Sequence, residues 1–156
     1  MRIDKFTTKF QQALADAQSL AIGSDQQFIE PQHLLLALIN QDDGGTTSLL
    51  ARAGVNVPGL KRDLEQALTR LPKVEGHGGD VSIGRDLGNL LNLTDKEAQK
   101  RGDQFIASEM FLLALGEDKG EAGRLAKQHG LSRKALEAAI MAVRGGQGVD
   151  SQEAEG

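Results

Sequence analysis

Side chains that perform catalysis or bind metals are few in this 156-residue chain. It has three histidines, His33, His77 and His129, and no cysteine. A metal site on a helix needs two ligands three or four residues apart, and no histidine has a His or Cys at that distance. We find neither a nucleophile with a partner base nor two poised carboxylates. The sequence therefore predicts no enzyme activity, and His33, at the start of a predicted helix, is assigned a structural or surface role.

Glycine clusters suggest a phosphate-binding loop, because backbone N–H groups at a helix start can hold an anion. The clusters do not follow a predicted strand, and none ends in Gly-Lys-Ser or Gly-Lys-Thr, the ending of a nucleotide-binding loop. They lie at 76–79, 116–123 and 145–148. Asp42 and Asp43 lack the alternating ligands of a calcium loop and are interpreted as a solvated turn. We expect neither a nucleotide cofactor nor a metal in this chain.

The composition favours packed helices. Apolar residues make up 39% of the chain, and Phe, with five copies, is the only aromatic type. This aliphatic core suits helices better than a sheet sandwich. The net charge of −4 repels phosphate backbones, which argues against nucleic acid binding. No apolar run approaches the ~20 residues of a membrane span, so we expect a cytoplasmic protein that does not contact a membrane.

The helices that would position any functional site are encoded by a sequence repeat. Residues 27–38 are QFIEPQHLLLAL and residues 104–115 are QFIASEMFLLAL, 77 positions later. The preceding helical stripe also repeats at this offset and is apolar at all but one position of the second copy. It consists of Phe6, Phe10, Ala13, Leu14, Ala17 and Ala21, then Ile83, Leu87, Leu90, Leu91, Thr94 and Ala98.

The repeat continues to the end of each copy. Leu49 and Gly54 match Leu125 and Gly130 at an offset of 76, so one residue is lost in the loop between. The pattern predicts an all-α fold of two four-helix copies: 4–22, 31–40, 46–53 and 57–70, then 83–101, 108–116, 120–129 and 132–144. Helix-end signals support these bounds: Pro31 and Pro58 suit first helical positions, Ser108 and Ser132 suit N-caps, and Gly54 and Gly130 suit helix ends.

The domain is therefore predicted to span 1–144, with repeat one at about 4–70, a connector at 71–82 and repeat two at 83–144. The sequence GGQGVDSQEAEG at 145–156 has no apolar stripe, so we expect a flexible linker.

Two differences between the copies suggest a binding surface. Leu93 stands where the first copy has Asp16, and Met110 stands where it has His33. Both side chains could be exposed, and methionine at a groove edge adapts to varied apolar partners. Alternatively, both could pack between the two copies.

The duplicated unit resembles the Clp N-terminal (Clp repeat) domain of the Clp ATPase chaperones. The resemblance runs from Arg2 to the 145–146 tail. The stretches RIDKFTTKFQQALADAQSLA, FIEPQHLL, LPKVEGHGGD and DKEAQKRGDQFI resemble the ClpB-type disaggregase branch. ClpA and ClpC would be expected to carry Thr-Glu or Ser-Glu where Glu30-Pro31 stands, so the resemblance favours the ClpB branch. The alternative is an adaptor-docking or regulatory domain of a Clp protease ATPase of the ClpA or ClpC type.

The resemblance implies a pseudo-twofold helical domain that binds unfolded or aggregated polypeptides and passes them to two ATPase modules. Those modules would use ATP and Mg, assemble as a homohexamer and cooperate with a DnaK-type chaperone. No Walker motif occurs in these 156 residues, so this part is expected to be a monomer without ATPase activity.

The family pattern also implies a substrate-binding site. Its polar rim falls on Thr7, Asp103 and Glu109, and its apolar groove on Leu91, Leu93 and Met110. Each rim residue also has a structural interpretation. Thr7 could start a helix, Asp103 could cap the turn at Gly102, and Glu109 could favour a helix dipole.

Overall fold

Each copy of the repeat folds into four helices. The computed structural model describes residues 2–42, 45–74, 79–145 and 147–155. The first copy holds α1 (Thr8–Gly23), α2 (Pro31–Ile39), α3 (Gly45–Arg52) and α4 (Val57–Thr69). The second holds α5 (Arg85–Lys100), α6 (Ser108–Leu115), α7 (Glu121–Gln128) and α8 (Arg133–Arg144). The predicted all-α, duplicated architecture is confirmed.

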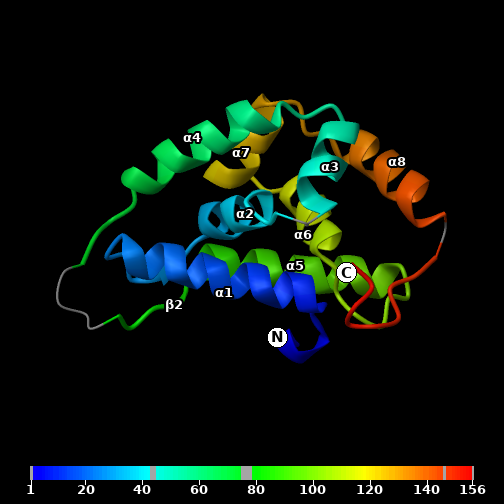
Figure 1. Ribbon diagram of the computed structural model, residues 1–156, viewed down its shortest axis with the longest axis horizontal. Helices are drawn as coiled ribbons and strands as arrows, with labels where there is room; N and C mark the ends of the chain where they lie inside the picture. Colours follow the sequence, from blue (N-terminus) through cyan, green and yellow to red (C-terminus); the bar gives the residue numbers. More distant parts are fainter. Residues whose placement is uncertain (1, 43–44, 75–78, 146, 156) are drawn as a thin grey trace.

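The core is built round the two copies of the repeated dozen. All nine residues of α2 are buried, as are all residues of α6 except Glu109. A helix that is apolar on every side must be surrounded by protein, whereas an outer helix buries one stripe. The predicted stripes are buried, apart from the half-buried Leu14 and Ile83. Figure 1 shows α2 and α6 in the middle of the molecule, with α1 and α5 below them.

Two predicted helix starts and one predicted N-cap were wrong. The helix expected from residue 83 begins at Arg85, because Ser82 and Ile83 form a strand. The first long helix begins at Thr8 rather than residue 4, because Ile3–Lys5 form a separate 3-10 turn and Phe6 is extended. Ser108 is the first residue of α6, and Ala107 occupies the N-cap position. The prediction for Ser132 is confirmed, since its side chain accepts a hydrogen bond from Ala135 N. Gly54 and Gly130 end helices with φ of +88° and +108°, as expected for glycine there.

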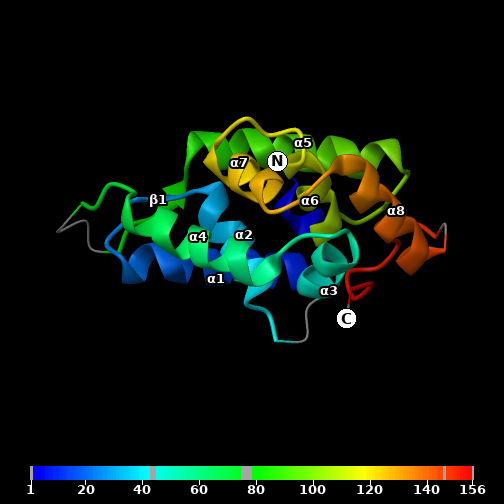
Figure 2. The ribbon, with the colours of Figure 1, turned by 90° about the horizontal axis from the view of Figure 1, so that it is seen from above.

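The two copies are joined by short parallel backbone pairings. Strand β1 (Phe28–Ile29) pairs with β2 (Ser82–Ile83), and Phe6 forms an isolated bridge with Ile106. Adding 77 to Phe6 and Ile29 gives positions 83 and 106, so the two pairings are equivalent under the repeat. The last helices cross over in the same way, because α3 packs on α8 and α4 packs on α7. Figure 2 shows these two pairs from above.

Candidate functional site

The three predicted rim residues lie at one end of the molecule. Thr7 precedes α1, Asp103 lies in the loop between α5 and α6, and Glu109 is in the first turn of α6. The bridge of Phe6 with Ile106 brings these segments together: Thr7 N donates to Ile106 O at 3.0 Å. Thr7 also caps α1, since its Oγ1 accepts from Phe10 N at 3.2 Å. Its helix-starting role is thereby confirmed, and its side chain is buried.

Arg144, the last residue of α8, links the two acidic rim residues. Its Nη1 lies 3.1 Å from Asp103 Oδ2, and its Nε bonds to Glu109 Oε1. The Asp103 side chain is fully buried and that of Arg144 is only 12% exposed. Burial raises the pKa of the Glu109 carboxyl, and the adjacent Arg144 opposes part of that rise. The carboxyl groups of Asp103 and Glu109 thus share one guanidinium in a largely buried cluster.

Sequence reasoning missed Arg144. The signal that could have found it is general: a buried carboxylate needs a cation or several donors, and Arg144 is the basic residue in the last turn of α8. One atom of this side chain, Nη2, is buried and has no hydrogen-bond partner among the described residues.

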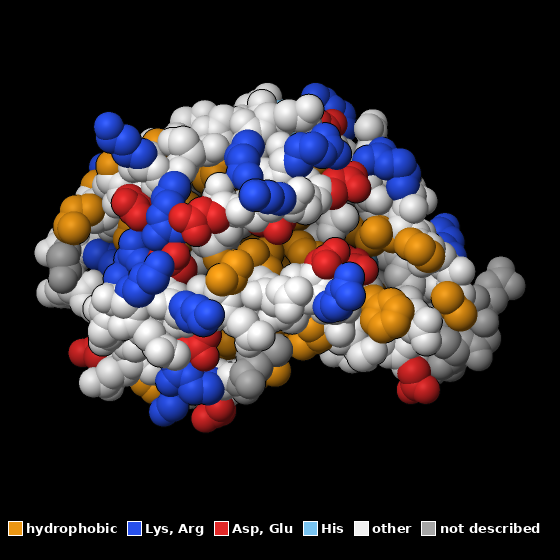
Figure 3. Space-filling model, turned by 180° about the vertical axis from the view of Figure 1, so that it is seen from behind, with side chains coloured by type: hydrophobic (Ala, Val, Ile, Leu, Met, Phe, Trp, Pro, Cys, Tyr) orange, Lys and Arg blue, Asp and Glu red, His pale blue; other side chains and the backbone are white. Residues whose placement is uncertain are grey.

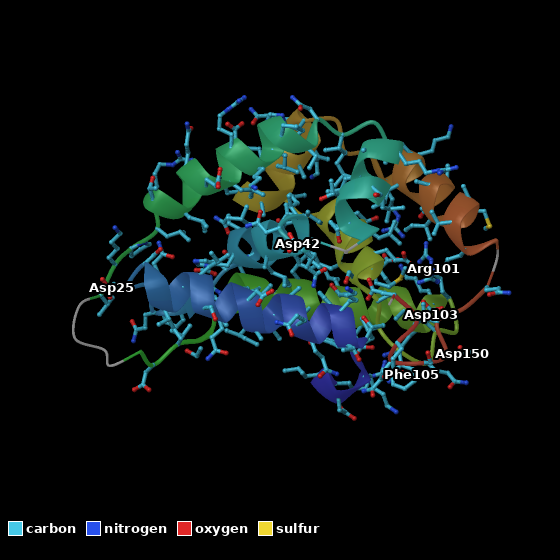
Figure 4. All side chains as sticks on the ribbon, viewed as in Figure 1. Asp25, Asp42, Arg101, Asp103, Phe105 and Asp150 are labelled. Atoms are coloured by element: carbon cyan, nitrogen blue, oxygen red, sulfur yellow. The ribbon has the colours of Figure 1, made fainter. Side chains whose placement is uncertain are left out.

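Residues 147–155, which we call the C-terminal strap, return to the same end of the molecule. Val149 N donates to Asp103 Oδ1 at 3.1 Å, and Val149 O accepts from Gln104 N and Phe105 N at 2.8 and 3.1 Å. Figure 4 shows Asp103, Phe105 and Asp150 gathered where the strap passes. A freely moving segment was expected from residue 145 onward, whereas the structure places the strap against the domain. Its role as a linker stays a prediction.

The end of the strap reaches the start of α6. The Glu155 carboxylate accepts hydrogen bonds from Ser108 N at 3.0 Å and Ser108 Oγ at 3.2 Å, and also from Thr7 Oγ1. Between these two anchors, Thr8 N donates to Gln152 O at 2.8 Å. A cavity of about 570 Å³ lies between the strap, α3 and the ends of α6 and α8.

The predicted groove residues do not form one surface. Leu91 and Met110 have no exposed area, because both belong to the central core, so the expectation that Met110 lies at an open groove edge was wrong for this conformation. The alternative, that Met110 packs inside the domain, is the one observed. Leu93 is 43% exposed, as the groove hypothesis expected. Contact of these residues with substrate stays a prediction.

Leu93 lines a second cavity, of about 360 Å³, away from the rim residues. Its wall comes from α5, the start of α2 and the loop before α7. Leu90 and Leu93 give it apolar surface, while Glu30 and Asp86 stand at its edge. Burial, and then the charge of Asp86, raises the pKa of Glu30. Seen from behind (Figure 3), hydrophobic side chains show in a hollow beside Asp and Glu side chains.

The histidines that the structure describes have structural partners. His33 is fully buried, its Nδ1 accepts from Glu30 N at 2.9 Å, and its Nε2 lies 2.6 Å from Gln26 Oε1. Burial lowers its pKa to about 4, so it is neutral at pH 7 and its structural role is confirmed. His129 bonds to Asp63 across the α7 and α4 pair at 2.7 Å. His77 and the glycines at 76 and 78 lie outside the described residues.

Among the described residues, no three His, Cys, Asp or Glu side chains are grouped so that they could hold a metal ion. Within the same ranges, no helix is long and apolar enough to cross a bilayer.

The described residues form a duplicated all-helical domain with a buried ionic cluster at one end and cavities beside the strap and beside Leu93. Residues 5–129 match the family model of the Clp repeat (R) N-terminal domain, so the chain belongs to this family. It is 52% identical to Chaperone protein ClpB of Vibrio cholerae and 47% identical to that of Pseudomonas putida. Each alignment covers 99% of this chain and 18% of the relative's length.

Solved structures share the fold. The Hsp104 N-terminal domain from Candida albicans superposes with a TM-score of 0.84 at 24% identity, covering 97% of this chain and 99% of that one. The N-terminal domain of the ClpV1 ATPase from E. coli gives a TM-score of 0.78 at 23% identity, covering 92% and 88%. The resemblance to a ClpB-type N-terminal domain is thus confirmed by sequence, and the fold by structure.

Proposed function

We propose that this domain is the N-terminal substrate-binding module of a ClpB-type protein disaggregase. The observation that carries the proposal is the 52% identity to Chaperone protein ClpB over 99% of the chain, since the ClpV likeness extends to the fold alone. The chain spans about a fifth of the length of these relatives. The whole protein would be a cytoplasmic, ATP- and Mg-dependent homohexamer that cooperates with a DnaK-type chaperone.

Leu93 and its cavity give unfolded polypeptides a place to bind. An apolar side chain on a surface helix, next to a hollow with acidic edges, suits short apolar segments flanked by basic or polar residues. Covering such a small surface yields only a few kcal/mol at ~25 cal/mol per Å² before the costs of association. Binding should therefore be weak and tolerant of sequence, which allows release to the ATPase modules.

The test compares two variants with similarly exposed apolar side chains. Leu93→Gln should weaken binding of a permanently unfolded probe, reduced and carboxymethylated α-lactalbumin, by roughly 5-fold, because the lost apolar contact is worth about 1 kcal/mol. Ile22→Gln is the matched control, since Ile22 is 40% exposed at the end of α1 and lines none of the cavities described above. Fluorescence anisotropy measures binding, and calorimetry checks that both melting temperatures stay close to that of the wild type.

If both variants bind the probe as the wild type does, Leu93 has no part in the site. If the wild type ignores unfolded chains and binds one folded protein tightly, the adaptor-docking alternative is favoured.

A further inference from the structure

The strap bonds to the domain through its backbone groups as well as through the side chains of Gln152 and Glu155. Gln104 N, Phe105 N and Thr8 N donate to strap carbonyl oxygens, and Val149 N is held by the Asp103 carboxylate. Such bonds do not depend on the side chains of the bound segment, which is how extended peptides are held on exposed backbone edges. Val149 supplies the only buried apolar side chain among the described strap residues.

The repeat offers an internal comparison for the other anchor. In the first copy, Glu30 occupies the N-cap of α2 and Pro31, which has no N–H, is its first residue. In the second copy, Ala107 occupies the N-cap and Ser108 is the first residue of α6, so an N–H and a hydroxyl are offered where the first copy offers neither. Both of these donors, and the Thr7 hydroxyl, point to the Glu155 carboxylate.

The start of α6 in the second copy can therefore bind a carboxylate, and its N-cap residue, Ala107, has none. In the first copy the N-cap residue, Glu30, carries a carboxylate itself. Glu155 is half-buried at the start of α6, although it lies 47 residues from Ser108 in sequence. A carboxylate at a helix start gains from the partial positive charge of the N-terminus. Two independent anchors, the Val149 backbone and the Glu155 carboxylate, hold a segment otherwise largely exposed to solvent.

We propose that the strap is a self-ligand: residues 147–155 occupy a site for an extended polypeptide segment and must leave before a substrate segment can enter. The site takes a small apolar residue at the Val149 position and a carboxylate six residues further on. This inference rests on the proposed function, because the incoming segment belongs to the unfolded polypeptide. Few buried apolar atoms hold the strap, so the free energy of detaching it from the domain should be far lower than that of global unfolding.

The experiment uses the intact chain with Glu155→Gln and Val149→Ser, singly and together. Glu153→Gln is the matched control, because Glu153 lies two residues earlier, is exposed, and forms no hydrogen bond or ion pair with the described residues. Amide hydrogen exchange at Thr8, Gln104, Phe105 and Ser108 should quicken at least 5-fold in the double variant and change less than 2-fold in the control. Equal exchange in both would overturn the inference.

The second measurement adds the strap in trans as a synthetic peptide, GGQGVDSQEAEG. It should bind the double variant at least 5-fold more tightly than the wild type, and a peptide with Gln at the penultimate position should lose this advantage. Equal affinity for both proteins would contradict the self-ligand.

Carboxymethylated α-lactalbumin separates the two proposals. If it binds the wild type and the double variant equally, the strap inference is contradicted and the proposed function is not. If it binds neither protein, the proposed function fails, and exchange with peptide binding still decides whether the strap is a displaceable ligand.

Discussion

At the residue scale, one position of the repeat shows how a duplicated core can carry two different side chains. The third residue of α2 is His33 and the third residue of α6 is Met110, and both are fully buried. His33 needs hydrogen-bond partners there, which the Glu30 N–H and Gln26 supply, whereas Met110 needs none. Gln26 in turn donates to Leu68 O at 2.6 Å. The first copy thus holds a polar chain from α2 to the end of α4.

This buried histidine should make the domain acid-sensitive. The pKa of His33 is about 4 in the folded state and ~6.5 in the unfolded state, so the unfolded chain takes up the proton first as pH falls. Stability is lost between pH 6.5 and pH 4. The loss due to His33 should be about 2 kcal/mol between pH 7.5 and pH 5.

Urea unfolding at both pH values measures this loss. The comparison is with His33→Gln, which cannot titrate and should be less stable at pH 7.5 but show a loss smaller by about 2 kcal/mol. Glu30 and Glu109, whose pKa values are raised, act in the opposite direction in both proteins, so the difference between the proteins isolates His33. Equal pH dependence of the two proteins would contradict the prediction.

The rim and groove residues show which parts of the candidate site could be predicted from the sequence. The resemblance grouped Thr7, Asp103 and Glu109 on one rim, and the structure brings these three residues together at one end of the molecule. Their role in binding substrate stays a prediction. Arg144 was missed because no local pattern links a last-turn arginine to an acid 41 residues earlier. Leu91 and Met110 were placed on an open groove although helical periodicity already put Leu91 on the buried stripe.

At the element scale, the second copy has an ionic tie between α5 and α8 that the first copy lacks. Glu97, only 5% exposed, accepts hydrogen bonds from two nitrogens of Arg133 at 2.8 Å. Arg133 lowers the pKa of Glu97 by direct hydrogen bonding, against the effect of burial. The equivalent of Glu97 in the first copy is Leu20, a half-buried apolar residue.

Removing the buried charge of Glu97 should destabilise the domain far more than removing an exposed carboxylate that pairs with the same arginine. Glu97→Gln should lower the free energy of unfolding by about 2 kcal/mol, since Arg133 loses its buried partner. Glu137→Gln should lower it by less than ~0.5 kcal/mol, because Glu137 also bonds to Arg133 at 2.8 Å but is 45% exposed. Denaturant unfolding at pH 7 compares the two variants, and similar losses would show that burial does not decide the strength of this tie.

The helices could be predicted from the sequence, whereas the contacts between segments distant in sequence could not. The period of apolar residues along α1 and α5 is a local property, so the eight helices could be placed within a few residues. The β1 and β2 pairing and the return of the strap depend on backbone groups distant in sequence, and backbone groups leave no trace in side-chain patterns. The strap lacks an apolar stripe, and this alone had suggested that it is unattached.

At the scale of the whole molecule, the two copies are interleaved rather than stacked. Each copy contributes one helix to the α3 and α8 pair and one to the α4 and α7 pair, and the backbone pairings also cross between copies. A single copy would leave these helix faces exposed to water. With about 70 residues and without the helices of the other copy, it would bury too little apolar surface to offset its conformational entropy.

The two halves should therefore fold only together. A fragment of residues 1–74 should show weak helical circular dichroism and no cooperative thermal transition, and so should a fragment of residues 79–156. Mixing them in equal amounts should restore most of the helical signal and give a 1:1 complex by analytical ultracentrifugation, because the crossing pairs re-form between chains. Mixing 1–74 with a 79–156 fragment carrying Leu136→Asp is the control, since Leu136 is a fully buried residue of α8. A sharp melting transition in either fragment alone would mean that one copy suffices as a folding unit, and that the duplication joined two domains already stable by themselves.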